Sequence, residues 1–258
     1  MTEHVRVAID DGVLRITLAR ADKKNALTQA MYTALGAALT RADADPSVRV
    51  VLLDAEGDAF TAGNDLADFA AVAAGTLDRK AMTTHQFLDA LAYARKPLVA
   101  AVNGLAVGIG VTMLLHCDLV FVAEDAKLST PFVNLALVPE AASSVLLQAR
   151  IGYARAYAMF AFGEPIDGRT AASLGLANAA LPASEVRAAA LAAAKKLASK
   201  PLGALQATKQ LMRDGAAIAA VMAKESEIFG TRLQSPETAE ALRAFAERRP
   251  PDFSKFGA

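Results

Sequence analysis

The feature that most constrains the fold is the alternation of strand-like and helix-like segments as far as Pro182. Val5–Asp10 and Val13–Leu18 alternate apolar and polar residues on either side of an Asp-Gly turn, which predicts a β-hairpin. Residues 48–53 and 97–102 are apolar runs that predict buried strands. Helices are predicted over residues 28–44, 78–95, 111–116, 140–151, 153–160 and 170–174. Strands that alternate with helices are typical of α/β folds, and we predict that class.

Beyond Pro182 the sequence predicts helices only, and alanine is abundant in them. The predicted helices cover residues 184–200, 201–213, 215–233 and 235–247. We therefore divide the chain into an α/β core, residues 1–199, and a helical region, residues 200–258. Alanine-rich helices bury little apolar area each, so we expect the helical region to pack against something else. A partner subunit is a natural candidate.

The composition excludes some classes of function. Hydrophobic residues make up 54% of the 258, which is enough for a substantial core. Lys plus Arg and Asp plus Glu number 27 each, so no net charge favours nucleic acid or an anionic membrane. The apolar runs are shorter than a membrane span, and the sequence shows no cluster of metal ligands. We therefore expect no bound metal. A single cysteine, Cys117, suits a reducing compartment, so we expect a cytoplasmic protein.

Two segments have the composition of ligand-binding turns. In residues 59–66 a strand runs into small residues and then an acid, and such a turn can present backbone N–H groups to a ligand. In residues 102–112, Gly104, Gly108 and Gly110 precede a predicted helix, so the backbone can approach a ligand closely. The glycine spacing matches neither a dinucleotide-binding fingerprint nor a P-loop.

Taken together, these segments resemble the crotonase superfamily of enoyl-CoA hydratases and isomerases. The resemblance rests on Ala-Gly-x-Asp at residues 62–65 and Lys-Pro-Leu-Val-Ala-Ala-Val-Asn-Gly at residues 96–104. It continues through Pro139 and Gly-Leu-Ala at residues 175–177, and so covers nearly the whole chain. It implies a ClpP/crotonase-like spiral of ββα units with a C-terminal helical trimerisation region. The expected assembly is a homotrimer or a dimer of trimers.

The same resemblance implies the chemistry. Members of the superfamily bind acyl-CoA thioesters, so coenzyme A is part of the substrate and no separate cofactor is expected. Two backbone N–H groups polarise the thioester carbonyl, and by position these belong to Asn64 and Ile109. Removing a proton next to a thioester at neutral pH requires stabilisation of the enolate oxygen, and two fixed N–H donors provide it.

The choice of reaction depends on where carboxylates stand. Hydratases of this superfamily use two glutamates, and the matching positions here hold Thr112 and Phe132. Pro139 and Glu140, followed by small residues and two serines, instead resemble the peroxisomal-type Δ3,Δ2-enoyl-CoA isomerases. We therefore expect Glu140 to act as the base that converts 3-enoyl-CoA to trans-2-enoyl-CoA in fatty-acid β-oxidation. Burial would raise the pKa of this carboxyl group toward the working range, whereas a position at the start of the predicted helix would lower it, so the sequence does not fix the direction of the net shift.

The resemblance also implies a set of residues that contact the substrate. This set comprises Lys24, Ala26, Ala62, Gly63, Asp65, Leu66, Gly108, Thr112 and Phe132. Asp65 could instead be an acid that stabilises the start of a helix, and Asp68 is expected to be a solvated helix acid. His85 and His116 are expected to be structural. Two other functions stay open: an enoyl-CoA hydratase or other crotonase-type enolate chemistry, and a non-catalytic acyl-CoA-binding protein.

Overall fold

The structure is a computed structural model that describes residues 2–73, 75–78 and 81–256. It begins with the predicted hairpin. Strands β1 (Val5–Asp10) and β2 (Val13–Leu18) pair antiparallel from Val5 with Leu18 to Asp10 with Val13. Both turn residues, Asp11 and Gly12, have positive φ, the backbone conformation that suits a two-residue hairpin turn.

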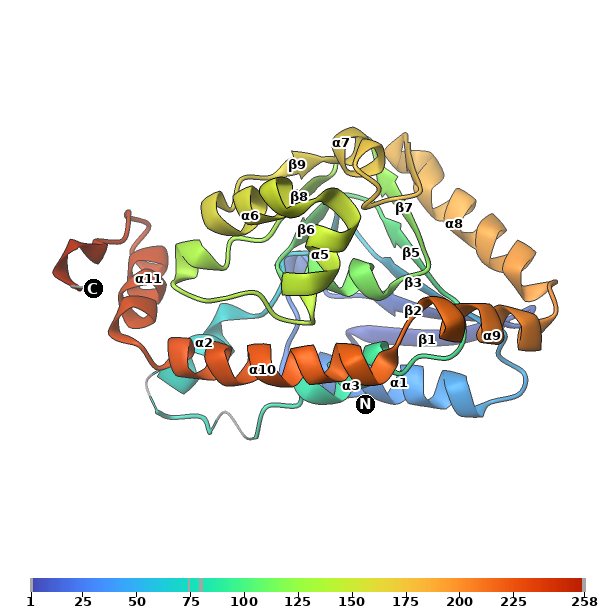
Figure 1. The fold of residues 1–258 in the computed structure, drawn as a ribbon, viewed down its shortest axis with the longest axis horizontal. Coiled ribbons are helices and arrows are strands. Elements are labelled where there is room, and N and C mark those ends of the chain that lie inside the picture. The colour runs from blue at the N-terminus through green and yellow to red at the C-terminus, as the bar shows by residue number, and fades with distance from the viewer. Residues whose placement is uncertain (1, 74, 79–80, 257–258) are drawn as a thin grey trace.

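Two sheets form the centre of the molecule (Figure 1). The larger has the order β1-β2-β3-β5-β7-β10 and is parallel from β2 onward. Its further strands are β3 (Val50–Ala55), β5 (Leu98–Val102), β7 (Leu119–Ala123) and β10 (Ala179–Leu181). Every residue of β3 and β5 is buried, which explains why these strands are continuous apolar runs.

The smaller sheet has the order β4-β6-β8-β9. Its strands are β4 (Ala59–Thr61), β6 (Leu105–Val107), β8 (Lys127–Ser129) and β9 (Ile166–Asp167). The first three are parallel, and β9 runs antiparallel to β8. Consecutive strands alternate between the sheets: β3, β5 and β7 belong to the larger sheet, and the strands that follow them, β4, β6 and β8, belong to the smaller. The expected α/β class and the repetition of ββα units are thus both present.

Helices surround the sheets. Within the core they are α1 (Gln29–Ala44), α2 (Leu66–Ala73), α3 (Thr84–Ala92), α4 (Ile109–Thr112), α5 (Ser143–Ile151), α6 (Tyr153–Phe162), α7 (Gly168–Ser173) and α8 (Ala183–Ala198). Short 3-10 turns are η1 (Ala21–Lys23), η3 (Met113–His116) and η4 (Val133–Leu135). Thr28 caps α1, because its hydroxyl accepts a hydrogen bond from the Met31 N–H. Helix α8 packs across β3, β5 and β7, and α1 packs against α3.

The helical region matches its prediction closely. It consists of α9 (Leu202–Met212), α10 (Gly215–Leu233), α11 (Pro236–Ala246) and the 3-10 turn η5 (Phe253–Lys255). Asp214 and Ser235 cap α10 and α11 with side-chain hydrogen bonds. Helix α10 crosses the molecule beside α3 and α2 (Figure 1). The end of α8 lies next to the predicted boundary, while the separation of the chain into two domains stays a prediction.

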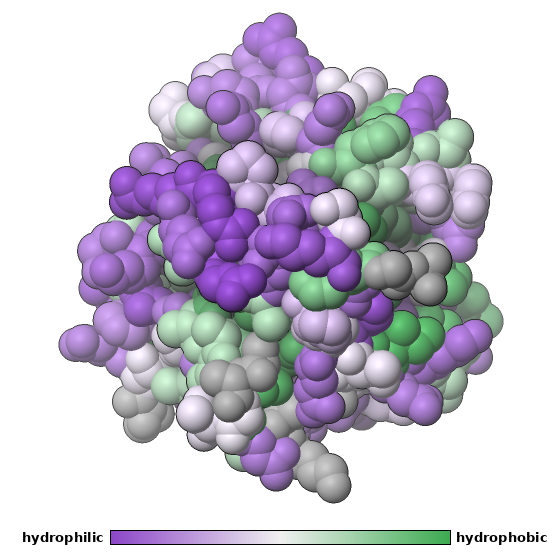
Figure 2. All heavy atoms as spheres, turned by 90° about the vertical axis from the view of Figure 1, so that its left-hand side faces the viewer, coloured by the Kyte–Doolittle hydropathy of each residue, from purple (hydrophilic) through white to green (hydrophobic). Residues whose placement is uncertain are grey.

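Figure 2 looks onto the end of the molecule that carries α11 and shows a broad hydrophilic patch with apolar side chains beside it. Part of the charge on α11 is paired within the chain. The buried carboxylate of Glu240 accepts a hydrogen bond from Arg249 at 2.6 Å and another from Arg243. Within the described residues, no helix is both long and apolar enough to cross a membrane.

Three predicted helices differ from the structure. The helix predicted over residues 78–95 is shorter, Thr84–Ala92, and its predicted residues 79 and 80 lie outside the described part of the chain. The helix predicted over residues 111–116 is the single turn α4 followed by η3. The helix predicted to open at Glu140 begins three residues later, at Ser143.

Candidate active site

The two predicted ligand-binding segments meet at the carboxyl ends of the strands of the smaller sheet. Strands β4, β6 and β8 are parallel neighbours, so the residues that follow them come together at their carboxyl ends. Contact there is close: a Cβ on Gly63 would lie 2.7 Å from the Val107 carbonyl oxygen. A Cβ on Gly110 would lie 2.7 Å from Cγ2 of Thr61. Glycine is therefore required where these two turns touch.

Asn64 is held by its neighbours so that its own N–H group is left free. The Leu27 N–H donates to the Gly63 carbonyl at 2.8 Å, and the Asp65 N–H donates to the Leu27 carbonyl at 3.0 Å. In this parallel pattern the N–H of Asn64 points away from Leu27. The side-chain oxygen of Asn64 accepts a hydrogen bond from the buried Tyr32 hydroxyl at 2.7 Å.

Ile109 has an equally free N–H group. It is the first residue of α4, so its N–H has no acceptor within the helix. No described protein atom accepts a hydrogen bond from the N–H of Asn64 or of Ile109. Gly108, which precedes Ile109, has φ +55° and ψ −115°, a combination that glycine adopts and other residues avoid.

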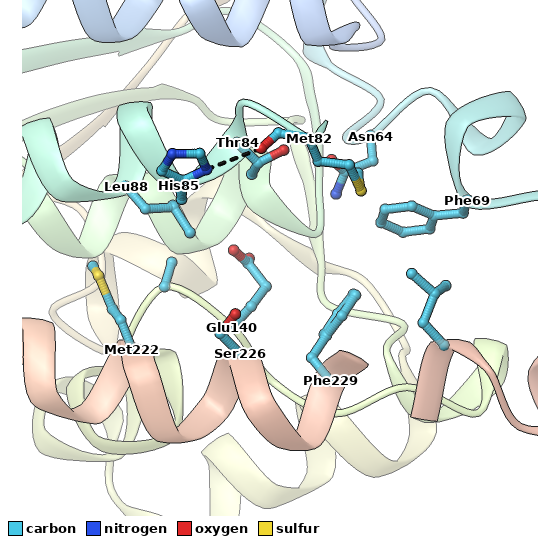
Figure 3. A pocket seen from close by; sticks show the side chains of 12 residues that line it. Asn64, Phe69, Met82, Thr84, His85, Leu88, Glu140, Met222, Ser226 and Phe229 are labelled. Carbon is cyan, nitrogen blue, oxygen red and sulfur yellow. Dashed lines mark hydrogen bonds between the residues drawn. The ribbon is translucent and has the colours of Figure 1, made fainter. Parts of the chain in front are cut away.

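Glu140 projects into a pocket of about 270 Å³ (Figure 3). Apolar side chains from α2, α3, α10 and the segment between α2 and α3 form much of its wall. The lining residues are Asn64, Phe69, Met82, Thr84, His85, Leu88, Glu140, Ala141, Met222, Ser226, Phe229 and Leu233. Glu140 is the one carboxylate among these described lining residues. Figure 3 shows its carboxyl group between α3 and α10.

The surroundings of Glu140 change its acidity. Burial raises the pKa of its carboxyl group to about 7, although the residue keeps some exposure where it opens onto the pocket. The Thr112 hydroxyl donates a hydrogen bond to Oε1 of Glu140 at 2.5 Å, and this bond opposes the rise in pKa. The negative charge of Glu225 adds to the rise. A carboxyl group with a pKa near neutrality is suited to accept and return a proton.

The backbone after Glu140 explains why the predicted helix start is wrong. Ala141 and Ala142 both have φ +58°, in the left-handed region that side chains with a Cβ disfavour. A helix cannot continue through such residues, so α5 begins only at Ser143. Each left-handed residue costs about 1–2 kcal/mol, and surrounding contacts must hold it.

One contact that holds this backbone comes from His116, which we predicted to be structural. Its Nε2 lies 2.8 Å from the carbonyl oxygen of Ala141, and its Nδ1 contacts the Arg213 guanidinium. Burial, and next the charge of Arg213, lowers the pKa of His116 to about 3, so the ring is neutral. Because Arg213 can only donate, Nδ1 is the acceptor and Nε2–H donates to Ala141.

The second contact comes from Glu225 on α10, which sequence reasoning missed. One oxygen of its carboxylate accepts a hydrogen bond from the Ala142 N–H at 2.6 Å. The other accepts from the Ser144 N–H at 2.9 Å. Glu225 is 83 residues from Ala142 in sequence, and no local pattern marks it.

Of the predicted site residues, Asn64 and Glu140 line the pocket, and the residues predicted to contact the substrate are not among its described lining residues. Lys24 is exposed after η1, and its carbonyl accepts a hydrogen bond from the Ala62 N–H at 2.8 Å. Ala26 follows in the same turn. Gly108 faces Phe132, and Leu66 and Phe132 belong to one apolar cluster.

Asp65 has a structural partner. Its carboxylate accepts a hydrogen bond from Arg20 at 2.8 Å and another from the Ala67 N–H at 3.2 Å, at the start of α2. Asp68, which we expected to be a solvated acid, accepts a hydrogen bond from Gln29 at 3.1 Å. His85 lies on the pocket wall, with its Nδ1 2.9 Å from the Met82 carbonyl oxygen.

Asn25 is a further residue that sequence reasoning missed. It is completely buried and has positive φ. Its side-chain oxygen accepts from the Arg20 N–H at 2.8 Å, and its amide donates to the carbonyls of Glu56 and Ala59, both at 2.9 Å. Asn25 thereby joins the turn that carries Lys24 to the start of β4.

Comparison with known proteins decides the family. A family model described as enoyl-CoA hydratase/isomerase matches residues 8–255. The chain belongs to the enoyl-CoA hydratase/isomerase family. Enoyl-CoA delta isomerase 2 of Rattus norvegicus is 34% identical over 95% of this chain, which spans 64% of the rat protein's length. Enoyl-CoA hydratase ACTT3 of Alternaria alternata is 35% identical over 94% of this chain and 83% of its own length.

Solved structures of similar sequence share the fold. An enoyl-CoA hydratase/isomerase from Pseudoalteromonas atlantica aligns with a TM-score of 0.92 at 38% identity and covers 98% of this chain and 100% of its own. OdaA of Pseudomonas aeruginosa aligns with a TM-score of 0.89 at 46% identity over 95% of this chain and 99% of its own. The expected crotonase fold is thus confirmed. Relatives of similar identity are named for either activity, so membership of the family does not fix the reaction.

Proposed function

We propose that this protein is a Δ3,Δ2-enoyl-CoA isomerase of fatty-acid β-oxidation, with Glu140 as its base. The observation that carries the proposal is that Glu140 is the single carboxylate among the described residues of the pocket wall. Hydration by the family's usual route needs two carboxylates, whereas moving a double bond needs one group that takes a proton and gives it back. The residues at the two hydratase positions are Thr112 and Phe132.

In the proposed reaction the carboxylate of Glu140 takes a proton from C2 of a 3-enoyl thioester. The electron pair of the broken C–H bond is delocalised onto the thioester oxygen, giving a dienolate. Electron density returns from this oxygen, the double bond forms between C2 and C3, and the protonated Glu140 gives its proton to C4. The proton count is unchanged, and neither a cofactor nor water is consumed.

The thioester oxygen needs donors throughout, and the free N–H groups of Asn64 and Ile109 support this role. Each such donor contributes about 3 kcal/mol to stabilisation of an oxyanion. Tyr32 helps to fix the first donor, because its hydroxyl holds the side chain of Asn64. Burial raises the pKa of the Tyr32 hydroxyl, and the carboxylates of Glu140 and Asp68 raise it further, so it stays a donor.

The deciding experiment compares wild type with Glu140→Ala on trans-3-hexenoyl-CoA, followed by the absorbance of the conjugated product. We expect isomerisation by wild type and a loss of about 10²–10⁴-fold in kcat for the variant, because proton transfer by a placed side chain contributes that much. Coenzyme A binding, measured by calorimetry, should be retained in the variant, since Glu140 faces the pocket and not the turn around Lys24.

Hydration of trans-2-hexenoyl-CoA is measured in parallel, since a relative of similar identity is named a hydratase. A wild type that hydrates the 2-enoyl thioester but leaves the 3-enoyl thioester unchanged contradicts the isomerase proposal. A wild type that binds coenzyme A and turns over neither thioester supports an acyl-CoA-binding protein.

We also propose that the chain assembles as a homotrimer or a dimer of trimers in the cytoplasm. The support for assembly is that Leu211 and Met212 on α9 are 90% and 82% exposed, an unusual position for large apolar side chains. The single buried cysteine suits a reducing compartment.

A further inference from the structure

The segment that carries Glu140 is strained and lacks a cap of its own. Two consecutive alanines after Glu140 have left-handed backbones, and both are 1% exposed. Ala142 is the N-cap of α5 and offers no side-chain hydrogen bond to the first turn. Without an acceptor from another element, the N–H groups of the buried Ala142 and the half-buried Ser144 would be unpaired, which is costly.

Glu225 supplies the missing acceptors from another helix. Glu225 is 7% exposed, and its two carboxylate oxygens accept one N–H each, from Ala142 at 2.6 Å and from Ser144 at 2.9 Å. A carboxylate that accepts two backbone N–H groups at a helix start is a strong, directional contact. It fixes both the left-handed turn and the first turn of α5 relative to α10.

Helix α10 also forms part of the pocket. Met222, Ser226 and Phe229 line it opposite α3, and Figure 3 shows the carboxyl of Glu140 between these two helices. Glu225 therefore lies on the same helix as this wall, and its side chain joins the wall to the segment that carries Glu140. His116 holds the same segment one residue before Ala142, through its contact with the carbonyl oxygen of Ala141.

We propose that Glu225 is a positioning residue for the reaction, which holds Glu140 in place by accepting the N–H groups of Ala142 and Ser144. The inference rests on the proposed role of Glu140 as base. Glu225 does not touch the reacting atoms. It acts through the backbone that follows Glu140, and its negative charge also acts on the Glu140 carboxyl.

The test compares Glu225→Ala and Glu225→Gln with wild type, with Glu227→Gln as a matched control. Glu227 lies on the same helix and is exposed. For Glu225→Ala we expect kcat on trans-3-hexenoyl-CoA to fall about 10–100-fold with little change in KM, because a base displaced by about 1 Å loses roughly that much rate. Glu225→Gln keeps the size of the side chain and one acceptor oxygen, so its kcat should lie between those of wild type and Glu225→Ala.

Glu225→Gln gives a second measurement that a merely structural role would not change. Removing the negative charge favours ionisation of Glu140, so the acid limb of the kcat/KM profile should move to lower pH. Amide hydrogen exchange of the peptide covering residues 141–147 should be faster in both Glu225 variants than in wild type and Glu227→Gln.

Unchanged kcat, acid limb and exchange in the folded Glu225→Gln variant would overturn the positioning role. A loss of activity explained entirely by a smaller folded fraction in both variants, judged by thermal unfolding, would overturn it as well. If wild type fails to isomerise the 3-enoyl thioester, the proposed function fails. Hydrogen exchange then still decides whether Glu225 holds the segment.

Discussion

The acidity of one carboxyl group controls the chemistry proposed for this pocket. Burial raises the pKa of Glu140 to about 7, the hydrogen bond from Thr112 opposes that rise, and the charge of Glu225 adds to it. Only the ionised form can take a proton from C2. We therefore expect kcat/KM to increase with pH through about 7 and then to level off.

Thr112→Val gives this expectation a sharper test. The variant keeps the shape of the side chain and removes the hydrogen bond that favours the carboxylate, so the acid limb should move to higher pH, opposite to Glu225→Gln. The measurement is kcat/KM against pH, with Thr33→Val on the exposed face of α1 as the control. A shift in the same direction for the Thr112 and Glu225 variants would contradict this account of the site.

The same group should also lower the stability of the protein. Its folded pKa of about 7 lies above the ordinary value of 4.5, so between these pH values the folded protein keeps a proton that the unfolded chain releases. Stability therefore falls as pH rises through this window and stays lower above it. We expect Glu140→Gln to raise the free energy of unfolding by about 1–3 kcal/mol at pH 8.

Denaturant unfolding of wild type and Glu140→Gln checks this expectation. At about pH 4 the carboxyl is mostly protonated in both states, so the difference between the two proteins should become small. An equal difference at both pH values would show that packing, and not ionisation, distinguishes them.

Which site residues are predictable from sequence depends on how they act. Asn64 and Glu140 lie in short motifs, so they could be predicted, and both line the pocket. Asn25 and Glu225 could not, because their hydrogen-bond partners are distant in sequence and any buried asparagine or helical glutamate would have the same local pattern. The left-handed alanines at 141 and 142 were missed since alanine itself favours helix.

At the scale of elements, His116 connects η3 to the segment before α5. Because the buried ring is neutral in the folded protein and its pKa is about 3, the unfolded chain binds a proton that the folded protein excludes below about pH 6.5. Stability should therefore fall with decreasing pH in that range, by up to about 1.4 kcal/mol per pH unit from this group.

His116→Asn removes the titrating group, and its unfolding free energy should depend less on pH between 4 and 6.5 than that of wild type. It should also be less stable at pH 8 by about 1–3 kcal/mol, because Ala141 and Arg213 lose a buried partner. Thermal and denaturant unfolding measure both effects. The exposed His85→Asn is the control, and an equal pH slope in His116→Asn and wild type would count against the neutral ring.

At the scale of the whole molecule, the strand and helix alternation was enough to predict the α/β class, and most of the predicted helices begin within a few positions of the observed ones. The division of the strands between two sheets could not be predicted. Strands β4, β6 and β8 have three residues each, too few for a periodic pattern, and their places depend on pairing with strands distant in the chain.

Assembly is the prediction that belongs to this scale. The exposed apolar side chains of α9, Leu211 and Met212, should be covered by a neighbouring copy. We expect sedimentation equilibrium to give the mass of three or six copies of the 26.9 kDa chain, and Leu211→Glu to reduce it. A monomeric mass for wild type at micromolar concentration would contradict the proposed trimer.

Helix α10 forms one wall of the pocket and, through Glu225, holds the segment that carries Glu140. A change that widens the pocket at Met222 or Phe229 also alters the support of the proposed base. Substrate range and turnover are therefore not independent traits in this protein. Directed evolution toward longer or bulkier acyl groups should first yield slower enzymes, and compensating substitutions should collect where α10 meets the start of α5.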